Sequence, residues 1–562
     1  MKLCIALSLA IFSAVASATS PLPRIPSGWQ AVGDTPRGTK IELVFAVKQQ
    51  NLKLLEETVL AVSDPRSSLY GKHLSNEDVH AMVAPATESV QAVNAFLAAH
   101  GVSGASKTPN SDFIVAQVSV EKAEAMLAPK GIHFTEFRHP EGHIVHRLRV
   151  ADADLTLPRN VRTSIDMVAP TNYVPTVRTL HRDIEAAEAP NALFNTPKVL
   201  RSLYNVGSTQ GKGGKYKQAV TAFLDQTYSE SSLQTFYKLF CGANQTFTCG
   251  QNSDATKVGL VGDETKGAGG TESMLDIEYI GATGAGVATE FWGFSGRNPY
   301  QKNDEPFLKW LYTVGNTSDA DVPKLFSTSY GEDEDLIPQA WSERTNVEFQ
   351  KAGARGISLL FASGDSGAAG DSGCGGKGND LFVPQWPSGS PWVTAVGGTS
   401  GSSPEVVAGL SSGGFSNRWD RPSWQKNAVS AYLTSAKLPD KKHFNSTGRG
   451  FPDIAAQAVN FVVVQFGIPL PGVSGTSCAS PTAAGVFGLL NDLRASANKS
   501  PLGFLNPFIY QNAASFNDIT SGSNNGCGFS TPGYPAAKGW DAATGLGSPD
   551  YSKLSAAVKA LP

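Results

Sequence analysis

The sequence predicts an α/β protein in which a parallel sheet is covered by helices on both faces, preceded by a smaller α+β unit. From residue 197 to residue 562, strand-like and helix-like segments alternate, which is the pattern of a parallel sheet. Within that part, the segment 356–362 is almost continuously apolar, as a strand buried on both faces requires. Residues 19–176 instead combine amphipathic helices with strands joined by short turns, so the two parts differ in architecture.

Hydrophobic periodicity places the individual elements. In the first unit we expect strands at 40–47, 112–118, 132–137 and 143–148, and helices at 51–62, 89–100 and 121–127. In the second we expect strands at 219–223, 257–261, 288–294, 325–329, 356–362, 393–396 and 459–466, and helices at 273–280, 341–352 and 481–493. Between the units, residues 177–196 are acidic and rich in alanine, without periodicity, which indicates a linker where maturation cleavage occurs.

The first 18 residues have the form of a secretory signal peptide. A lysine precedes an apolar run, and Ala16-Ser17-Ala18 is a small-x-small cleavage site. The alternative, a membrane anchor, needs a longer run to cross about 30 Å as a helix. We therefore expect a secreted, extracellular protein without a membrane segment, or alternatively one in a vacuolar or lysosomal lumen.

The cysteines fit an oxidising compartment. Cys4 leaves with the signal peptide, and the odd number that remains leaves one thiol without a partner. We expect the pairs Cys241–Cys249 and Cys374–Cys527, with Cys478 unpaired and either reactive or packed and inert, the second being favoured. Sequons at Asn244, Asn316, Asn445 and Asn498 would mark surface positions of a glycoprotein.

Charge and histidine content exclude several classes of function. The 562-residue chain has a formal net charge of -3, whereas a nucleic-acid-binding protein would carry a basic excess. Eight of the nine histidines lie at or before His181, and the remainder of the chain holds only His443. Any mechanism in that part that needs two histidines is excluded. The upstream histidines could instead protonate near their unperturbed pKa of about 6.5 and loosen the first unit, unless they are simply exposed.

The sharpest motif is Ser474-Gly475-Thr476-Ser477-Cys478-Ala479-Ser480-Pro481, between a glycine-rich turn and an apolar helix. A serine at a helix N-terminus lies near N–H donors that suit a developing oxyanion, although serine is also an ordinary N-cap residue. Gly-Thr-Ser-x-Ala-x-Pro resembles the nucleophile motif of subtilisin-like serine peptidases. Ser477 is therefore the candidate nucleophile.

A serine nucleophile needs an adjacent base, and no His-Gly-Thr motif is present to supply it. His443 lies in a polar stretch and is expected at the surface. Glu272 and Asp276 are spaced to share one face of a helix, where two like charges raise one proton affinity. The alternative is that they face water near a helix N-terminus. Beside a serine that lacks a histidine, the pair becomes the favoured base.

Asp365 follows the apolar strand in Ala362-Ser363-Gly364-Asp365-Ser366-Gly367. The carboxyl end of a parallel strand is where α/β sheets bind their ligands. A protonated Asp365 could donate a hydrogen bond to an oxyanion, as neutral carboxylic acids do in some enzymes. The alternative is an aspartate that only shapes a glycine-rich turn.

Together these residues resemble the sedolisin family of serine-carboxyl peptidases, which includes tripeptidyl-peptidases. The resemblance covers nearly the whole chain. Its further blocks are Tyr70-Gly71-Lys72-His73-Leu74-Ser75, similar to the propeptide signature; Ser327-Thr328-Ser329-Tyr330-Gly331, similar to the substrate-binding strand; and Pro391-Trp392-Val393-Thr394-Ala395-Val396-Gly397-Gly398-Thr399. The fold that the family implies is a subtilisin-like α/β domain with a ferredoxin-like propeptide.

The resemblance also implies roles. Glu272 would take the proton of Ser477, Asp276 would hold Glu272, and Asp365 would stabilise the tetrahedral intermediate. One structural Ca²⁺ would bind the C-terminal loop, since carboxylates and carbonyls are the ligands that calcium takes. By resemblance its ligands are the side chains of Asp518 and Asp541 and the carbonyls of Ile519, Ala537 and Gly539. The family often has glycine where Ala537 stands.

The sequence therefore predicts a secreted, acid-acting serine-carboxyl peptidase made as a self-processing zymogen, with its own propeptide as inhibitor and chaperone. By resemblance it releases tripeptides from free amino termini of peptides or partly degraded proteins. The alternatives are an endopeptidase of the same family and an inactive homologue that only binds peptides. We expect a monomer that binds neither nucleic acid nor membranes.

Overall fold

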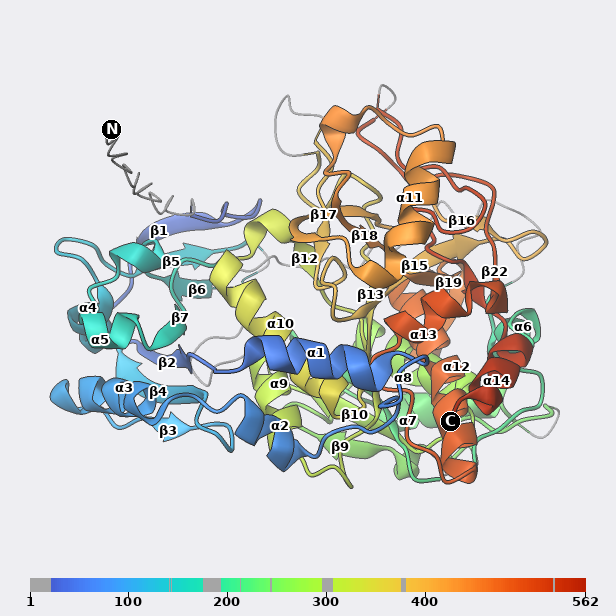
Figure 1. Ribbon diagram of the computed structural model, residues 1–562, viewed down its shortest axis with the longest axis horizontal. Coiled ribbons are helices and arrows are strands. Elements are labelled where there is room, and N and C mark those ends of the chain that lie inside the picture. Colours follow the sequence, from blue (N-terminus) through green and yellow to red (C-terminus); the bar gives the residue numbers. More distant parts are fainter. Residues whose placement is uncertain are drawn as a thin grey trace, which may run out of the picture.

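The computed structural model describes residues 22–140, 142, 144–174, 194–212, 214–242, 245–295, 307–374, 381–528 and 531–562. The predicted signal peptide and most of the predicted linker lie outside these residues. Within them, no helix is long and apolar enough to cross a membrane. In Figure 1 the N-terminal unit forms one end of the molecule, beside the larger domain.

The N-terminal unit is built on an antiparallel sheet in the order β3-β4-β2-β7. These strands are β2 (Lys40–Val47), β3 (Ala105–Ser106), β4 (Phe113–Ser119) and β7 (Ile165–Ala169). Because helices follow the first and third of these strands, the order is that of the ferredoxin-like βαββαβ motif, as predicted. A second sheet contains β1 (Gln30–Asp34), β5 (Thr135–Arg138) and β6 (Ile144–Arg147). The helices are α1 (Leu52–Ser63), α2 (Asn76–Met82), α3 (Thr87–Ala99), α4 (Val120–Leu127) and α5 (Arg159–Arg162).

The larger domain contains the predicted parallel sheet. Its strands lie in the order β9-β10-β8-β11-β13-β15-β19, and the antiparallel strand β16 also pairs with β15. Their bounds are β8 (Gln218–Ala222), β9 (Gly259–Val261), β10 (Thr289–Gly293), β11 (Leu325–Thr328), β13 (Ser358–Ala362), β15 (Thr394–Ser400), β16 (Val406–Val407) and β19 (Ile454–Gln457). Strand order reverses between β8 and β11, and ligands of such sheets bind outside the carboxyl ends of the strands at that point.

Helices cover both faces of this sheet. On β13, Leu360 packs into a core shared with α8 (Thr271–Thr283) and α12 (Thr476–Ser496), whereas Leu359 and Phe361 pack toward α9 (Phe307–Asn316) and α10 (Gln339–Ala354). This alternation follows from the two-residue period of a strand. The other helices are α6 (Pro197–Leu203), α7 (Glu230–Phe240), α11 (Lys426–Ser435), α13 (Asn506–Gln511) and α14 (Tyr551–Ala560). Short two-stranded sheets join β12 (Glu332–Asp333) to β14 (Gln385–Trp386), β17 (Gly414–Asp420) to β18 (Gly448–Phe451), β20 (Phe461–Gln465) to β21 (Ile468–Val473) and β22 (Phe516–Asn517) to β23 (Ser548–Pro549).

The strand predicted at 459–466 is confirmed as β20, which pairs with β21 in a hairpin outside the main sheet. The helix predicted from residue 481 begins at Thr476 instead, so Ser477 and Pro481 lie inside it. Proline lacks the N–H that would bond to the carbonyl four residues earlier, which made Pro481 look like a helix start.

The two units share one apolar core. Leu55, Val59 and Phe113 of the N-terminal unit pack in the same cluster as residues of α9 and α10. Helix α1 packs against α10 (Figure 1). The N-terminal unit is therefore docked by burial of apolar surface as well as by polar contacts.

Candidate active site

Helices α8 and α12 pack against each other on one face of the sheet, and the first carries the predicted base while the second carries the predicted nucleophile. Glu272 lies in the first turn of α8, and Asp276 lies one turn further on. Glu272 is 3% exposed, Asp276 is 0% exposed and Ser477, in the first turn of α12, is 4% exposed. The alternative that the two carboxylates face water is therefore wrong.

Strand β11 is tied to both helices at its carboxyl end. Ser329 donates a hydrogen bond through its Oγ to Asp276 Oδ1 at 2.7 Å. The hydroxyls of Ser327 and Ser480 lie 2.8 Å apart, which joins β11 to α12. The predicted substrate-binding strand therefore lies directly beside the predicted catalytic helices.

Asp365 follows β13 and caps α12. Its Oδ1 accepts hydrogen bonds from the backbone N–H and the hydroxyl of Thr476, at 2.6 and 2.8 Å. Gly475 has a φ of 149°, and a Cβ there would lie 2.9 Å from Asp365 Oδ2. Glycine is thus required at this position because the carboxyl group approaches the backbone so closely.

The pKa of the Cys478 thiol depends on the charges around the site. Cys478 is unpaired and fully buried, as predicted. Burial raises the pKa of its thiol well above the usual value, and the negative charges of Glu272, Asp365 and Asp276 raise it further. The negative charges of these three carboxyl groups act on the residue next to Ser477, and the thiol stays protonated and unreactive.

The loop that carries Asp365 is attached to the C-terminal part of the chain. Ala368 donates a backbone hydrogen bond to the carbonyl of Asn525 at 2.8 Å, and the predicted disulfide Cys374–Cys527 is present. The other predicted disulfide, Cys241–Cys249, is also present.

His443 was predicted at the surface, and this was wrong. It is only 6% exposed, and its ring stacks on Phe382 with 5.7 Å between the ring centroids. The polar residues before it in the sequence are exposed and misled the prediction, because burial here depends on a contact with a distant part of the chain.

The predicted calcium ligands lie near one another. Asp518 accepts a hydrogen bond from the N–H of Gly539 at 2.9 Å, which joins the two segments of the predicted loop. Asp541 is fully buried and binds the N–H groups of Ala537, Ala543 and Thr544. A buried carboxylate needs a compensating charge, and carboxylates with nearby carbonyls form a donor set that fits Ca²⁺. Among the described residues, no group of three or more His, Cys, Asp or Glu side chains could hold a metal on its own.

Some residues of the site were not predicted. Thr476 and Ser329 both lie in motifs that were singled out, but their hydrogen bonds to Asp365 and Asp276 join segments far apart in the sequence.

Comparison with known proteins decides the family. A model of the pro-kumamolisin activation domain matches residues 27–174, and a subtilase-family model matches residues 300–528. Tripeptidyl-peptidase 1 of Bos taurus is 37% identical over 568 residues, covering 97% of each chain. The protein of that name from Homo sapiens is 36% identical over 548 residues, covering 94% of this chain and 93% of its own. This chain belongs to the tripeptidyl-peptidase 1 family.

The predicted membership of the sedolisin group is thereby confirmed. The family member described here is a serine-type peptidase with an N-terminal propeptide. Among solved structures, Pseudomonas sedolisin, a serine-carboxyl proteinase, matches with a TM-score of 0.52 at 23% identity. That match covers 66% of this chain and 99% of the other, which shows the shared fold.

Proposed function

We propose that this peptidase releases tripeptides from the free amino termini of peptides, in acid, through an acyl-enzyme on Ser477. The observation that supports this most directly is that Asp365 binds the N-terminal turn of α12, which carries Ser477, while α8 packs on α12 and carries the buried Glu272 and Asp276. The relatives from Bos taurus and Homo sapiens carry the name tripeptidyl-peptidase 1. The two alternatives remain endopeptidase cleavage and peptide binding without catalysis, and intact Glu272, Asp276, Asp365 and Ser477 argue against the latter.

In the proposed reaction, Ser477 Oγ forms a bond to the substrate carbonyl carbon while its proton passes to Glu272. Asp276, held by Ser329, orients Glu272. The oxyanion receives a hydrogen bond from protonated Asp365. Glu272 then returns the proton to the leaving amine, and water releases the acyl group by the same steps. Acid favours this chemistry because Asp365 must carry a proton while Glu272 accepts one.

The chain is proposed to be a zymogen with signal peptide 1–18, propeptide 19–176, linker 177–196 and peptidase domain 197–562. Both disulfides suit an oxidising compartment, which supports a secreted protein or one delivered to a vacuolar or lysosomal lumen. One Ca²⁺ is proposed to bind Asp518, Asp541 and the carbonyls of Ile519, Ala537 and Gly539. When bound, it would supply positive charge to the buried Asp541 and so stabilise the loop.

The function is tested with a long peptide in two forms, one with a free amino terminus and one acetylated. Both are incubated at acid pH with mature enzyme, and the products are identified by mass spectrometry. Tripeptides from the free form alone support the proposal. Internal cleavage of both forms would establish the endopeptidase instead.

The nucleophile is tested in the same assay with Ser477→Ala. This variant should have no activity and should leave the linker uncut when purified alone. Self-processing by the pure variant would overturn the assignment of Ser477.

A further inference from the structure

A buried carboxylate on β12 holds the turn that follows Asp365. Asp333 is the last residue of this strand and is 0% exposed. Its Oδ1 accepts a hydrogen bond from the backbone N–H of Asp371 at 2.8 Å, and its Oδ2 accepts one from that of Ser372 at 2.8 Å. A Cβ at Gly370, where φ is 69°, would lie 2.7 Å from Asp333 Oδ1, so the turn closes tightly around the carboxylate.

One link from this turn leads back to Asp365. Ser366, the residue after Asp365, donates a hydrogen bond through its Oγ to Asp371 Oδ1 at 2.6 Å. The backbone of Asp371 is itself bound by Asp333. A shift of the turn would therefore move the acceptor of the Ser366 hydroxyl, and with it the backbone next to Asp365.

A second link reaches the residue on the other side of Asp365. Gln385 of β14 pairs with Asp333 and donates a hydrogen bond through its Nε2 to Asp333 Oδ1. The Cγ of Gln385 lies 3.0 Å from the position of a Cβ on Gly364, so this glycine packs tightly against it. Both chain neighbours of Asp365 therefore contact a residue that Asp333 binds.

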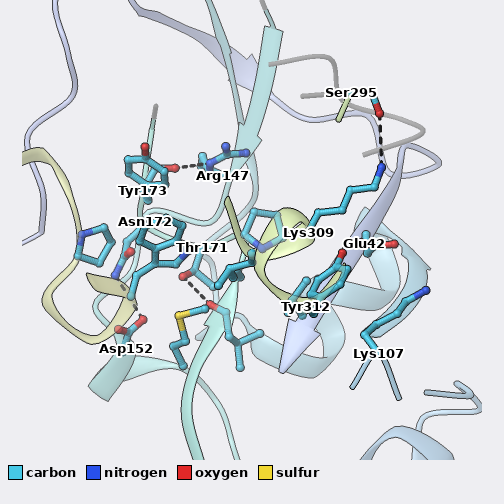
Figure 2. A pocket seen from close by; sticks show the side chains of 18 of the residues that line it. Glu42, Lys107, Arg147, Asp152, Thr171, Asn172, Tyr173, Ser295, Lys309 and Tyr312 are labelled. Atoms are coloured by element: carbon cyan, nitrogen blue, oxygen red, sulfur yellow. Dashed lines mark hydrogen bonds between the residues drawn. The ribbon is translucent and has the colours of Figure 1, made fainter. Parts of the chain in front are cut away.

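Asp333 makes its contacts within the peptidase domain, unlike the residue before it. The phenol of the propeptide residue Tyr173 donates a hydrogen bond to Glu332 Oε1. Figure 2 shows Tyr173 on the wall of a cavity of about 650 Å³ between the propeptide and the peptidase domain. Successive side chains of a strand point to opposite faces, and the partners of Asp333 among the described residues all belong to the peptidase domain. Its contacts should therefore remain after the propeptide leaves.

The carboxylate of Asp333 suits the two N–H donors of the turn. An ionised carboxyl group accepts hydrogen bonds on both of its oxygens. An amide has one acceptor oxygen, and its NH₂ group would face the N–H of either Asp371 or Ser372. One buried donor would then lose its partner, which is costly. Asp333→Asn therefore loosens the turn with almost no change in side-chain shape.

We propose that Asp333 is a positioning residue for the reaction, which holds Asp365 where the oxyanion forms. This inference rests on the proposed function, in which Asp365 donates a hydrogen bond to the oxyanion. Such a donor must lie about 3 Å from the oxyanion, and a misplacement of about 1 Å can lower a rate about 100-fold. Asp333 thus acts on the rate only through Asp365.

The test measures kcat and KM of mature enzymes for a peptide with a free amino terminus. We expect Asp333→Asn to lower kcat about 10- to 100-fold with little change in KM. Asp371→Ala, at an exposed position, removes the acceptor of Ser366 and should lower kcat about 3- to 10-fold. Asp371→Asn keeps an acceptor oxygen and should restore most of that loss.

Double variants distinguish positioning from damage to the fold. In an Asp365→Ala background, Asp333→Asn should cause no further loss of kcat, because residues that act as a unit are not additive. Glu334→Gln is the matched control. Glu334 follows Asp333, is 1% exposed and accepts hydrogen bonds from Ser416 Oγ at 2.6 Å and from the N–H of Asn417 at 2.8 Å. Its effect on kcat should be the same with and without Asp365→Ala.

The outcomes separate this inference from the proposed function. If folded Asp333→Asn leaves kcat unchanged, or lowers it equally in the Asp365→Ala background, the positioning role is refuted while the function stands. If Asp365→Ala itself leaves kcat unchanged, the proposed mechanism fails, and the role of Asp333 fails with it. Thermal unfolding of each variant checks the fold. If Asp333→Asn does not fold, the same comparison with Asp371→Ala decides the question, since a loss that persists in the Asp365→Ala background would refute the role.

Discussion

At the residue scale, Asp365 contributes to the site in two ways. Its Oδ1 caps α12 through Thr476, and its carboxyl group is proposed to stabilise the oxyanion. These roles need different chemistry, because the cap needs an acceptor and the oxyanion needs a donor. An amide provides both at any pH, whereas a methyl group provides neither.

This difference gives a prediction for two variants. Asp365→Ala should lower kcat about 100- to 1,000-fold, the usual cost of losing an oxyanion donor. Asp365→Asn should keep more activity and should extend it toward higher pH, because its donor does not depend on protonation. The check is kcat against pH for both mature variants. Equal losses with an unchanged pH profile would show that Asp365 only caps the helix.

At the element scale, the sequence correctly predicts those strands and helices whose bounds are determined by local patterns. Strand β2 was predicted with its observed bounds, because buried and less buried residues alternate over its first six positions. Helix α12 was placed five residues late, because the carboxylate that caps it lies 111 residues away. The candidate carboxylates of the site could be predicted because they lie in motifs.

The C-terminal loop gives a prediction at the same scale. If Ca²⁺ binds Asp518 and Asp541, a chelator should lower the midpoint of thermal unfolding and added Ca²⁺ should restore it. Binding at 100 times Kd contributes about 2.7 kcal/mol to stability. Asp518→Asn should abolish the calcium response, measured by thermal unfolding with Ca²⁺ and with Mg²⁺. If the midpoint of thermal unfolding of the wild-type protein changes with neither chelator nor Ca²⁺, the site is refuted.

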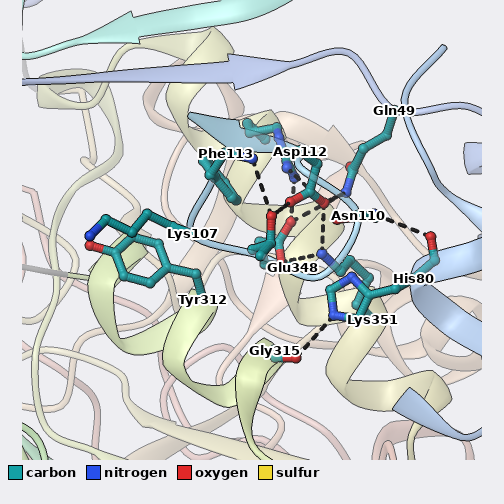
Figure 3. A network of polar contacts seen from close by, with 12 residues as sticks. Gln49, His80, Lys107, Asn110, Asp112, Phe113, Tyr312, Gly315, Glu348 and Lys351 are labelled. Carbon is teal, nitrogen blue, oxygen red and sulfur yellow. Dashed lines mark hydrogen bonds and ion pairs between the residues drawn. The ribbon is translucent and has the colours of Figure 1, made fainter. Parts of the chain in front are cut away.

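At the scale of the whole molecule, the propeptide is docked through buried charges. Figure 3 shows Asp112 of the propeptide beside Lys351 and Glu348 of α10. The Lys351 Nζ lies 2.9 Å from Asp112 and 2.8 Å from Glu348, and Arg344 lies 3.3 Å from Asp112. Burial raises the pKa of Asp112, but Lys351 and Arg344 outweigh it and hold the pKa well below the usual value. Acid therefore leaves this ion pair intact.

Histidines at the same interface respond to acid instead. The ring of His73 lies between Gly356 and Gly503, where added Cβ atoms would lie 2.5 and 2.6 Å from it, and its Nε2–H donates to the carbonyl of Pro501 at 3.0 Å. Burial lowers the pKa of His73 to about 4, opposed by the Pro501 carbonyl, and nearby Lys324 and Arg494 lower it further.

His80 is in a similar position. Its Nε2–H donates to the carbonyl of Gly315 at 3.1 Å (Figure 3). Burial lowers the pKa of His80, as does Lys351, while Asp112, Glu348 and the Gly315 carbonyl oppose the shift. Both rings therefore favour the neutral form while the propeptide is docked.

Since the docked state lowers these pKa values from about 6.5, it is stabilised above pH 6.5 and loses that stabilisation as the pH falls toward 4. For His73 the full effect is about 3 kcal/mol. Self-processing should therefore accelerate over this range, and His73→Gln should flatten the dependence of its rate on pH. The check is the zymogen cleavage rate at a series of pH values.

His133→Gln is the matched control, because that ring is 46% exposed and lies away from the interface, paired with Glu124. The pH profile of mature enzyme should be unchanged in both variants, since neither histidine remains in it. A processing profile for His73→Gln that is as steep as that of wild type would contradict the role of this histidine.

The attachment of the Asp365 loop to the segment around Cys527 has a consequence for the order in which the protein folds during synthesis. A ribosome completes the propeptide first and the segment around Asn525 almost last. The loop that carries Asp365 cannot donate its backbone hydrogen bond to the carbonyl of Asn525, or form its disulfide, until nearly the whole chain has been synthesised. On the proposed mechanism, an unfinished chain would carry Ser477 without a supported Asp365, whereas the propeptide would have been present from the start.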